Sequence, residues 1–257
     1  MADNSKTYKI ESVLLQSERL NVDVELREVV QDVEIFEHMQ KPYLTGFIFL
    51  VDNENMFQNA DVLGGERITV AVKSLRDDTE VVKKNFYISK VLNTEKINDN
   101  IQTVAIHLVE DINFISNALN VNRYYSGKPS KILQDIASEF LDKELIGTQT
   151  DKQKLSLIVP NLNPIEAMQW ICSRSTNRDG YPFYLYSTFV GDALQFNDLG
   201  SMLQNPVINA DVTYKYSSKA TKSDDTDVKR RTIFSHEFLG ATENLYKVIQ
   251  KGIIGSK

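Results

Sequence analysis

The sequence contains few of the residues that most often carry out chemistry. Its 257 residues include one cysteine, Cys172, one tryptophan, Trp170, and three histidines. One cysteine cannot form an internal disulfide, so the fold does not depend on an oxidising compartment. The histidines, His38, His107 and His236, lie far apart in sequence, and none belongs to a metal-binding spacing such as HExxH. We therefore expect each histidine to be a packed or surface residue.

Long apolar runs and an excess of positive charge are also absent from the sequence. The stretch TGFIFLV, Thr45 to Val51, is too short to span a bilayer. The N-terminus MADNSKTYK lacks the apolar core of a secretory signal, so we expect a soluble protein made in the cytoplasm. The formal net charge of −6 argues against sequence-independent affinity for nucleic acid, which needs clustered lysine and arginine. A surface along which DNA slides is compatible with this charge.

No catalytic motif is present. The sequence has no GxSxG, no phosphate loop and no dinucleotide fingerprint. The segment SDDTD, Ser223 to Asp227, lacks the glycine and the distant glutamate of a calcium loop, which favours a solvated loop. KRR, Lys229 to Arg231, is a weak nucleic-acid signal in an acidic chain. We therefore predict no catalytic residues, no cofactor and no metal ligands.

The first 111 residues have the alternating pattern of antiparallel strands. Gly64 and Gly65 suit a turn before one of them, and the polar segment TEKINDN, 94–100, suits a hairpin connection. The predicted strands are YKIESVLL (8–15), NVDVELREVV (21–30), TGFIFLVD (45–52), ERITVAVKS (66–74), KNFYISKVLN (84–93) and IQTVAIHLVE (101–110). Short strands with polar connections predict a small antiparallel barrel or sandwich.

Helical patterns begin near residue 112. INFISNAL, 112–119, suits a short helix, and the segment 128–145 suits a longer one that begins at Pro129. The residues that fall on one face of this longer helix are apolar: Ile132, Leu133, Ile136, Phe140 and Leu141.

A second helix is predicted in NPIEAMQWICSRS, 163–175. Asn163 suits the N-cap, and Glu166 follows three positions later, as in a capping box. Cys172 lies on the apolar stripe, which favours a buried, inert thiol. Trp170 is more often a core residue than a ligand shelf. PFYLYST (182–188) and ALQFNDL (193–199) predict two strands around a turn at Gly191 and Asp192.

Strand patterns return in VINADVTYKYSS (207–218) and RTIFSHEF (231–238). We therefore predict an α+β, mainly β fold with three parts. These are an antiparallel barrel-like first domain over 1–111, an α/β insert over 112–205 and the start of a second β-rich domain over 206–257.

The order of these parts resembles the baseplate hub subunit of T4-type contractile-tailed phages. It is similar, more distantly, to the D-protein and VgrG hub families. A β-rich part precedes YYSGKPSKILQDIASEFL, then LSLIVPNLNPIEAMQWICSRS, then PFYLYSTFVGDALQFNDL, then a β segment beginning VINADVTYKYS. The positions that match the two helices and the hairpin of the family are 131–141, 164–173 and 183–196. The resemblance covers most of the chain and depends on element order.

The resemblance implies a structural virion protein rather than an enzyme. Members of the family are homotrimers with two related barrels per chain, called tube domains, so three chains form a ring of six similar modules. The ring joins the six-fold tail tube to the three-fold spike and contacts other baseplate proteins, with DNA only as passing cargo. The α/β insert packs outside the ring, held by Trp170 and its neighbours. We expect a contractile-tail component for viral genome ejection, assembled in the host cytoplasm without membrane insertion of this chain.

The sequence departs from the family after residue 257, where further strands would follow. The second tube domain, 206–257, is therefore expected to be incomplete, since it is short for a closed barrel. Two other classes of function stay open. One is a β-rich hydrolase with an acidic pair drawn from Asp192, Asp198 and Glu166. The other is a carbohydrate- or peptide-binding module that uses the aromatic residues of PFYLY, 182–186.

Overall fold

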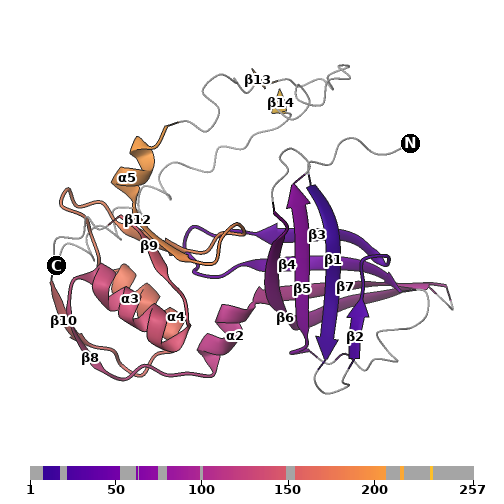
Figure 1. The fold of residues 1–257 in the computed structure, drawn as a ribbon, viewed down its shortest axis with the longest axis horizontal. Helices are drawn as coiled ribbons and strands as arrows, with labels where there is room; N and C mark the ends of the chain where they lie inside the picture. The colour runs from indigo at the N-terminus through magenta and orange to yellow at the C-terminus, as the bar shows by residue number, and fades with distance from the viewer. Residues whose placement is uncertain are drawn as a thin grey trace.

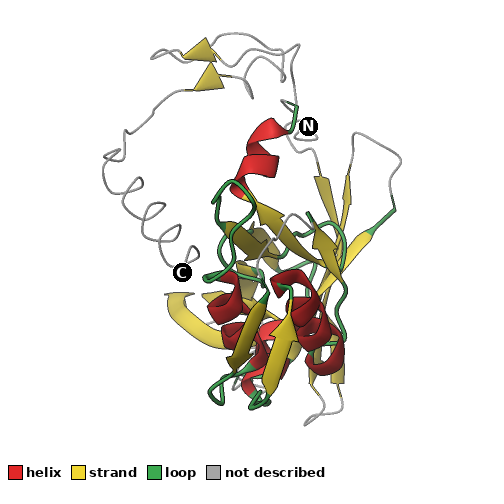
Figure 2. Ribbon diagram, turned by 90° about the vertical axis from the view of Figure 1, so that its left-hand side faces the viewer, coloured by secondary structure: helices red, strands yellow, loops and turns green. Residues whose placement is uncertain are grey.

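The computed structural model describes residues 8–17, 22–52, 62, 64–74, 80–98, 101–148, 154–206, 215–216 and 232–233 of the chain. This described part is α+β and mainly β, as the sequence predicts. A curled antiparallel sheet lies beside a smaller unit of helices and short strands, which we call the α/β unit (Figure 1). In the view turned by 90°, the helices of the α/β unit lie in front of the sheet (Figure 2).

The sheet has seven antiparallel strands in the order β2-β1-β5-β6-β7-β4-β3. Its strands are β1 (Tyr8–Ser17), β2 (Val22–Glu25), β3 (Val30–Phe36), β4 (Thr45–Asp52), β5 (Arg67–Ser74), β6 (Val82–Asn98) and β7 (Ile101–Glu110). Alternate side chains enter one core, as the sequence pattern predicts. The buried members of this sheet core are Val13, Leu15, Leu26, Leu44, Ile48, Leu50, Ile68, Val70, Phe86, Ile88, Val104, Ile106 and Leu108.

The two edges of the sheet are joined by a very short connection. β2 pairs with β1 at one edge and β3 pairs with β4 at the other, yet only residues 26–29 separate β2 from β3. The N–H of Leu26 donates to the carbonyl of Val13 at 2.7 Å, and the N–H of Val51 donates to the carbonyl of Val29 at 2.9 Å. Four residues span at most about 14 Å, so the edges meet at this corner and the sheet curls into a barrel-like shape.

Two boundaries predicted for these strands are wrong. The single strand expected over 21–30 is broken by a turn at 27–29, because the chain there changes its partner from β1 to β4. The polar segment 94–100 is not all connection, since β6 continues to Asn98, which lies opposite Ile101. β5 pairs with β6 only between Val82 and Tyr87, so the later part of β6 extends beyond the end of β5.

The α/β unit begins directly after the sheet. Its elements are α2 (Asp111–Asn117), β8 (Tyr124–Gly127), α3 (Pro129–Phe140), β9 (Leu145–Gly147), β10 (Leu155–Ile158), α4 (Pro164–Cys172), β11 (Phe183–Tyr186), β12 (Leu194–Asp198) and α5 (Leu199–Gln204). β8 pairs with β10, and a second small sheet has the order β11-β12-β9. Of these, β8, β9 and α5 were not predicted. They are three to six residues long, which is too short to show a period.

The two longer helices form as the sequence predicts. Pro129 and Pro164 occupy the first turns of α3 and α4, and the side chain of Asn163 accepts the N–H of Glu166 at 2.9 Å. Their predicted apolar faces meet in a second core. The buried members of this α/β core are Ile112, Val121, Tyr125, Ile132, Leu133, Ile136, Ala137, Leu141, Val159, Ile165, Ala167, Met168, Ile171, Cys172, Phe183, Leu185, Leu194 and Phe196.

After residue 206 the structure describes only β13 (Lys215–Tyr216) and β14 (Thr232–Ile233), which pair in parallel. The rest of the predicted second tube domain lies outside the described residues, together with SDDTD, KRR and His236. That domain therefore stays a prediction.

Candidate functional site

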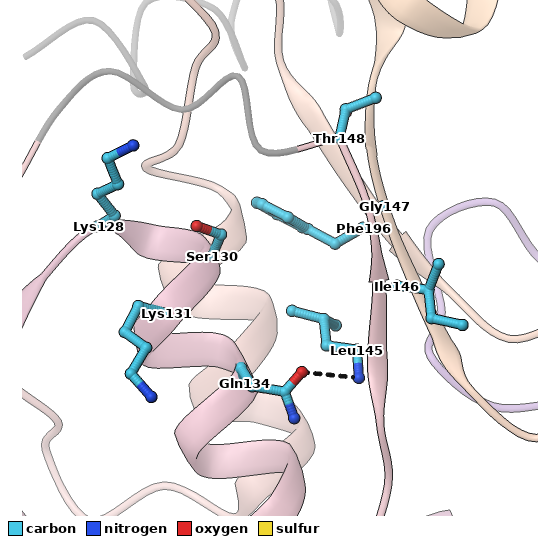
Figure 3. Close-up of a pocket in the computed structure, with 9 residues that line it drawn as sticks. All are labelled: Lys128, Ser130, Lys131, Gln134, Leu145, Ile146, Gly147, Thr148 and Phe196. Carbon is cyan, nitrogen blue, oxygen red and sulfur yellow. Dashed lines mark hydrogen bonds between the residues drawn. The ribbon is translucent and has the colours of Figure 1, made fainter.

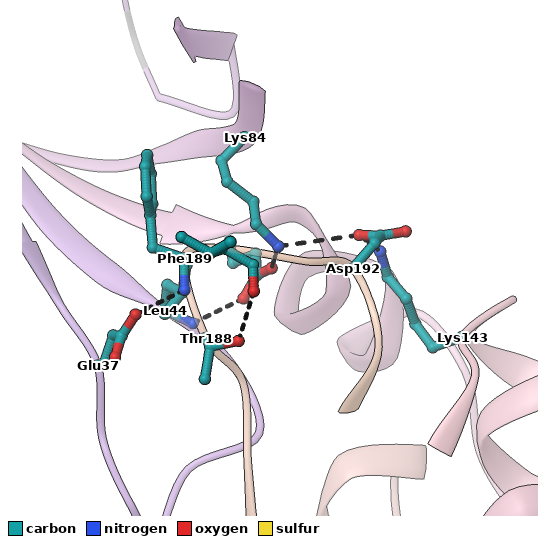
Figure 4. Close-up of polar contacts among 9 residues, drawn as sticks. Glu37, Leu44, Lys84, Lys143, Thr188, Phe189 and Asp192 are labelled. Carbon is teal, nitrogen blue, oxygen red and sulfur yellow. Dashed lines mark hydrogen bonds and ion pairs between the residues drawn. The ribbon is translucent and has the colours of Figure 1, made fainter. Parts of the chain in front are cut away.

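The junction between the sheet and the α/β unit contains a group of polar contacts between segments far apart in the sequence. One side is the loop 187–193, which connects β11 to β12 and reaches the sheet (Figure 4). The N–H of Phe189 donates to Oε1 of Glu37 at 2.6 Å, and the Phe189 ring packs against the sheet core. The loop thus places one of its own side chains in the core of the other unit.

Four charged groups meet beside this loop. Nζ of Lys84 on β6 lies 3.5 Å from Oε1 of Glu110 at the end of β7, and both side chains are almost fully buried. Oε2 of Glu110 accepts the N–H of Leu44 at 2.7 Å. Asp192 of the loop adds a second carboxylate, which lies 3.9 Å from Lys84 and forms an ion pair with Lys143 (Figure 4). Two cations therefore face two anions at the junction.

Burial dominates the protonation of Glu110. Loss of solvent raises the pKa of its carboxyl, while the Leu44 N–H and the charge of Lys84 act in the opposite direction. A buried ion pair contributes little net stability, but removal of one partner leaves an uncompensated charge. Lys84 and Glu110 both belong to the sheet, so the ionic contact that crosses the junction is the one between Lys84 and Asp192, and separation of the units would leave Lys84 with Glu110 alone.

Further contacts join the two units around this cluster. The rings of Tyr87 on β6 and Phe114 on α2 stack with centroids 4.2 Å apart. Nε2 of Gln169 on α4 donates to the carbonyl of Gln40 at 3.2 Å, and Tyr43 packs against the α/β core. The α/β unit is thus fixed to the sheet from several elements.

An aromatic cluster covers part of the outer face of the sheet, opposite the core. Phe47 on β4 contacts Phe36 at 5.9 Å, Phe49 at 6.3 Å and His107 at 5.1 Å between ring centroids. Burial and the charges of nearby lysines lower the pKa of His107, so its ring is neutral at pH 7. These contacts make His107 a packed residue, as predicted from its strand position.

A shallow pocket lies between the start of α3 and the strands β9 and β12 (Figure 3). It encloses about 220 Å³. Oε1 of Gln134 accepts the N–H of Leu145 across it, at 3.0 Å. The described residues that line it include two lysines and no acid, thiol or imidazole: Lys128, Ser130, Lys131, Gln134, Leu145, Ile146, Gly147, Thr148 and Phe196.

The acidic residues considered for a hydrolase do not come together. Asp192 lies at the junction, whereas Asp198 is fully buried at the other end of β12 and accepts hydrogen bonds from Thr148, Asn177 and Ser201. Asp192 lies in the loop before β12 and Asp198 is the last residue of β12, whose five residues span roughly 15 Å, so the two acids lie at opposite ends of this strand. Glu166 is exposed in the first turn of α4. The structure therefore gives this alternative no acidic pair.

Of the aromatic residues of PFYLY considered for a ligand shelf, Phe183 and Tyr184 are buried and Tyr186 is partly exposed. Phe183, Tyr184 and Leu185 are at most 6% exposed, and Phe183 stacks on Phe196 at 4.3 Å. Cys172 is buried as predicted, and its thiol donates to the carbonyl of Phe183 at 3.3 Å.

Trp170 is only partly buried, at the edge of the α/β core, with the Arg174 guanidinium 4.0 Å from its ring centroid. Arg174 also donates to the carbonyl of Trp170 at 2.8 Å, as expected for a cation at a helix C-terminus.

His38 lies in the connection between β3 and β4, and its Nε2 is 3.0 Å from Oγ1 of Thr45, the first residue of β4. Within the described ranges, no group of three or more His, Cys, Asp and Glu is placed to hold a metal ion. Of the helices that the structure describes, none has the length and apolar character needed to cross a bilayer.

The junction residues Lys84, Glu110 and Asp192 were not predicted as a group. A signal for two of them is nevertheless present in the strand pattern. Lys84 lies on the same inward-facing side of its strand as Phe86 and Ile88. Glu110 likewise lies on the same side of its strand as Ile106 and Leu108. A charge at an inward position of two adjacent strands indicates a buried pair.

No protein-family model matches the chain, and the search of curated proteins found no match. Solved structures do match it, at low sequence identity. The chain is similar to phage tail proteins. The 43 kDa tail protein of prophage MuSo2 from Shewanella oneidensis is 11% identical, with a TM-score of 0.46, and the match covers 73% of this chain and 54% of that one.

Two further tail proteins show the same likeness. The tail protein from Neisseria meningitidis MC58 is 12% identical, with a TM-score of 0.47 and coverage of 84% of this chain and 58% of that one. The prophage tail protein gp18 from Listeria monocytogenes EGD-e is 9% identical, with a TM-score of 0.49 and coverage of 80% and 56%. This chain thus spans little more than half the length of these proteins.

Proposed function

We propose that this chain is a structural protein of a phage tail and, more specifically, the central hub of the baseplate. In this role it is a homotrimeric adaptor between the six-fold tail tube and the three-fold spike. The observation that carries the proposal is a β sheet curled by the short corner at residues 26–29 and followed at once by an α/β unit fixed to it. That order of parts is the one that the sequence resemblance implies for a hub.

The proposal divides the chain into a first tube domain over 1–111, an α/β insert over 112–205 and a second β-rich part over 206–257. Two observations support the first boundary. The sheet core ends with Leu108, and the α/β core begins with Ile112, so the two cores have no buried residue in common. The chain passes from one to the other at Glu110 and Asp111, where β7 ends and α2 begins.

The proposed partners are the spike, the tail tube and other baseplate proteins in a contractile tail. DNA is passing cargo during genome ejection, and the net charge of −6 suits a wall that does not bind it. Assembly takes place in the host cytoplasm, without membrane insertion of this chain. The proposal includes no enzymatic activity, no cofactor and no metal, and it is supported by the separation of the acidic residues described above.

The mass of the purified protein in solution tests the proposal. We expect light scattering to give about three times the chain mass of 29.3 kDa, and electron microscopy to show closed rings with three-fold symmetry. Three copies that meet head to tail close such a ring. A monomer over the whole measurable concentration range, or an assembly without a three-fold axis, would contradict the hub.

A further inference from the structure

We propose that the loop 187–193 is a latch that holds the α/β unit on the sheet, and that Asp192 is the residue whose loss opens it. The proposal does not depend on the function proposed above. It concerns how two hydrophobic cores of one chain are kept in a fixed orientation, and it follows from the contacts of a single loop.

The latch has an apolar contact and a polar contact on the sheet. The ring of Phe189 packs against the sheet core, although the residue belongs to the loop between β11 and β12 of the α/β unit. Its N–H donates to Glu37 at 2.6 Å, just after β3. Within the loop, Oγ1 of Thr188 donates to the carbonyl of Val190 at 2.8 Å, which shapes the turn that presents the ring (Figure 4).

Asp192 provides the electrostatic part of the latch. Lys84 and Lys143 are poorly hydrated, with 7% and 15% of their side chains exposed, whereas the Asp192 side chain is 78% exposed. Of the ion pairs that the structure describes, removal of Asp192 would take away that of Lys143 and leave Lys84 with Glu110 alone. Lys84 would lose its anion across the junction and Lys143 its ion pair while both side chains are poorly hydrated, which favours movement of the loop that brings water to them.

Opening the latch leaves both cores complete. Phe189 is a partly buried neighbour of the sheet core, and neither core has a buried member within 187–193. The units stay connected through the chain at residues 110–111 and through α2, where Phe114 stacks on Tyr87. Opening at the loop therefore removes the contacts of Phe189 and Asp192 with the sheet and widens the range of orientations that the remaining contacts, at Tyr87, Gln40 and Tyr43, allow, without unfolding either unit.

Spin-label distance measurements on the full chain test the latch. Cysteines for labelling are introduced at Glu34 of β3 and Ser138 of α3, both exposed, while Cys172 is buried and is left in place. Asp192→Asn is compared with Asp179→Asn, a matched change at another exposed aspartate of the same unit. We expect Asp192→Asn to broaden the distance distribution and Asp179→Asn to leave it as in the parent.

Cleavage by chymotrypsin after Phe189 gives a second readout. The ring is packed in the latched state, so Asp192→Asn is expected to accelerate this cleavage by about 5- to 10-fold, as for increased local opening. Unchanged distances and unchanged cleavage in Asp192→Asn, relative to Asp179→Asn, would overturn the proposal. If Asp192→Asn does not fold, Glu37→Ala decides the question in the same way, because it removes the acceptor of the Phe189 N–H from the sheet side.

Discussion

At the scale of single residues, the buried carboxylates of this protein organise its loops. Asp198 is fully buried and accepts hydrogen bonds from Asn177, Thr148 and Ser201, which ties two loops to the end of β12. Glu25, which is exposed, likewise accepts from the hydroxyl of Ser12 and from the N–H of Val13, where β1 and β2 meet the corner of the sheet. Both carboxylates thus accept hydrogen bonds from donors of neighbouring segments, which fixes their positions.

The protonation of Glu110 gives a prediction about pH. Burial raises the pKa of this carboxyl in the folded protein above its usual value of 4.5. The folded state then binds the proton more tightly than the unfolded state does. The contribution of Glu110 to stability is therefore present at pH values below its pKa in the unfolded state. It is lost as the pH rises through the pKa of Glu110 in the folded state.

We therefore compare the free energy of unfolding of the wild type with that of the Glu110→Gln variant. As the pH rises from 4.5, we expect the wild type to lose stability relative to the variant. Denaturant titrations at several pH values measure it. The difference between the two proteins isolates Glu110, because acids such as Glu25, whose pKa is lowered, contribute equally to both. A difference that does not vary with pH between 4.5 and 8 would contradict the assigned direction.

At the scale of elements, the short strands of the α/β unit exist because longer neighbours hold them. β9 has three residues and pairs in parallel with β12, and the N–H of Thr148 continues the pairing to the carbonyl of Phe196 at 3.1 Å. Gly147 allows this approach. A Cβ placed on it would lie 1.9 Å from the carbonyl oxygen of Phe196, and its φ of +155° is unfavourable for other residues.

Gly147→Ala is expected to destabilise the protein more than Gly127→Ala. Both glycines have nearly the same φ, +155° and +153°, but a Cβ on Gly127 meets no atom within 4 Å. The backbone cost of about 1–3 kcal/mol is therefore common to both variants. The additional loss in Gly147→Ala, of ~1 kcal/mol or more, reports the clash with β12. Thermal or denaturant unfolding of the two variants measures it, and equal losses would show that β9 moves away from β12 without cost.

At the scale of the whole molecule, two hydrophobic cores are joined by a polar junction. The sheet core and the α/β core contain different residues, and the junction holds four charged groups between them. Each unit thus has a core of its own, while the junction holds the two units together.

The separation of the cores predicts a local response to a core mutation. Ile136 of α3 is fully buried, so Ile136→Ala is expected to lower the stability of the α/β unit by about 2–5 kcal/mol. Hydrogen exchange should accelerate in α3 and α4 and stay unchanged at Val104, Ile106 and Leu108 of the sheet. Ile158→Ala is the control, since Ile158 is 66% exposed. Equal acceleration in both units of Ile136→Ala would show that the two cores unfold as one.

The sequence by itself predicted the parts that repeat a pattern over many residues. The alternation in 45–52 and 101–110 predicted β4 and β7, and the helical spacing from Ile132 to Phe140 predicted α3 with its buried face. The N-cap of α4 at Asn163 could be predicted because its hydrogen-bond partner, Glu166, is only three residues away. Each of these features depends on neighbours along the chain, so a single sequence contains the whole signal.

Only the tertiary structure decided the features that depend on distant partners. The core-facing positions shift from even before the corner at 26–29 (Val24, Leu26) to odd after it (Val33, Ile35), but this shift does not show that the chain there leaves β1 and joins β4. β9 exists because β12 lies beside it, and the ion pairs of Asp192 reach Lys84 and Lys143, which are 108 and 49 residues away. A pattern of period 2 or 3.6 identifies which face of an element is buried, but the element that covers this face is fixed only when the chain packs.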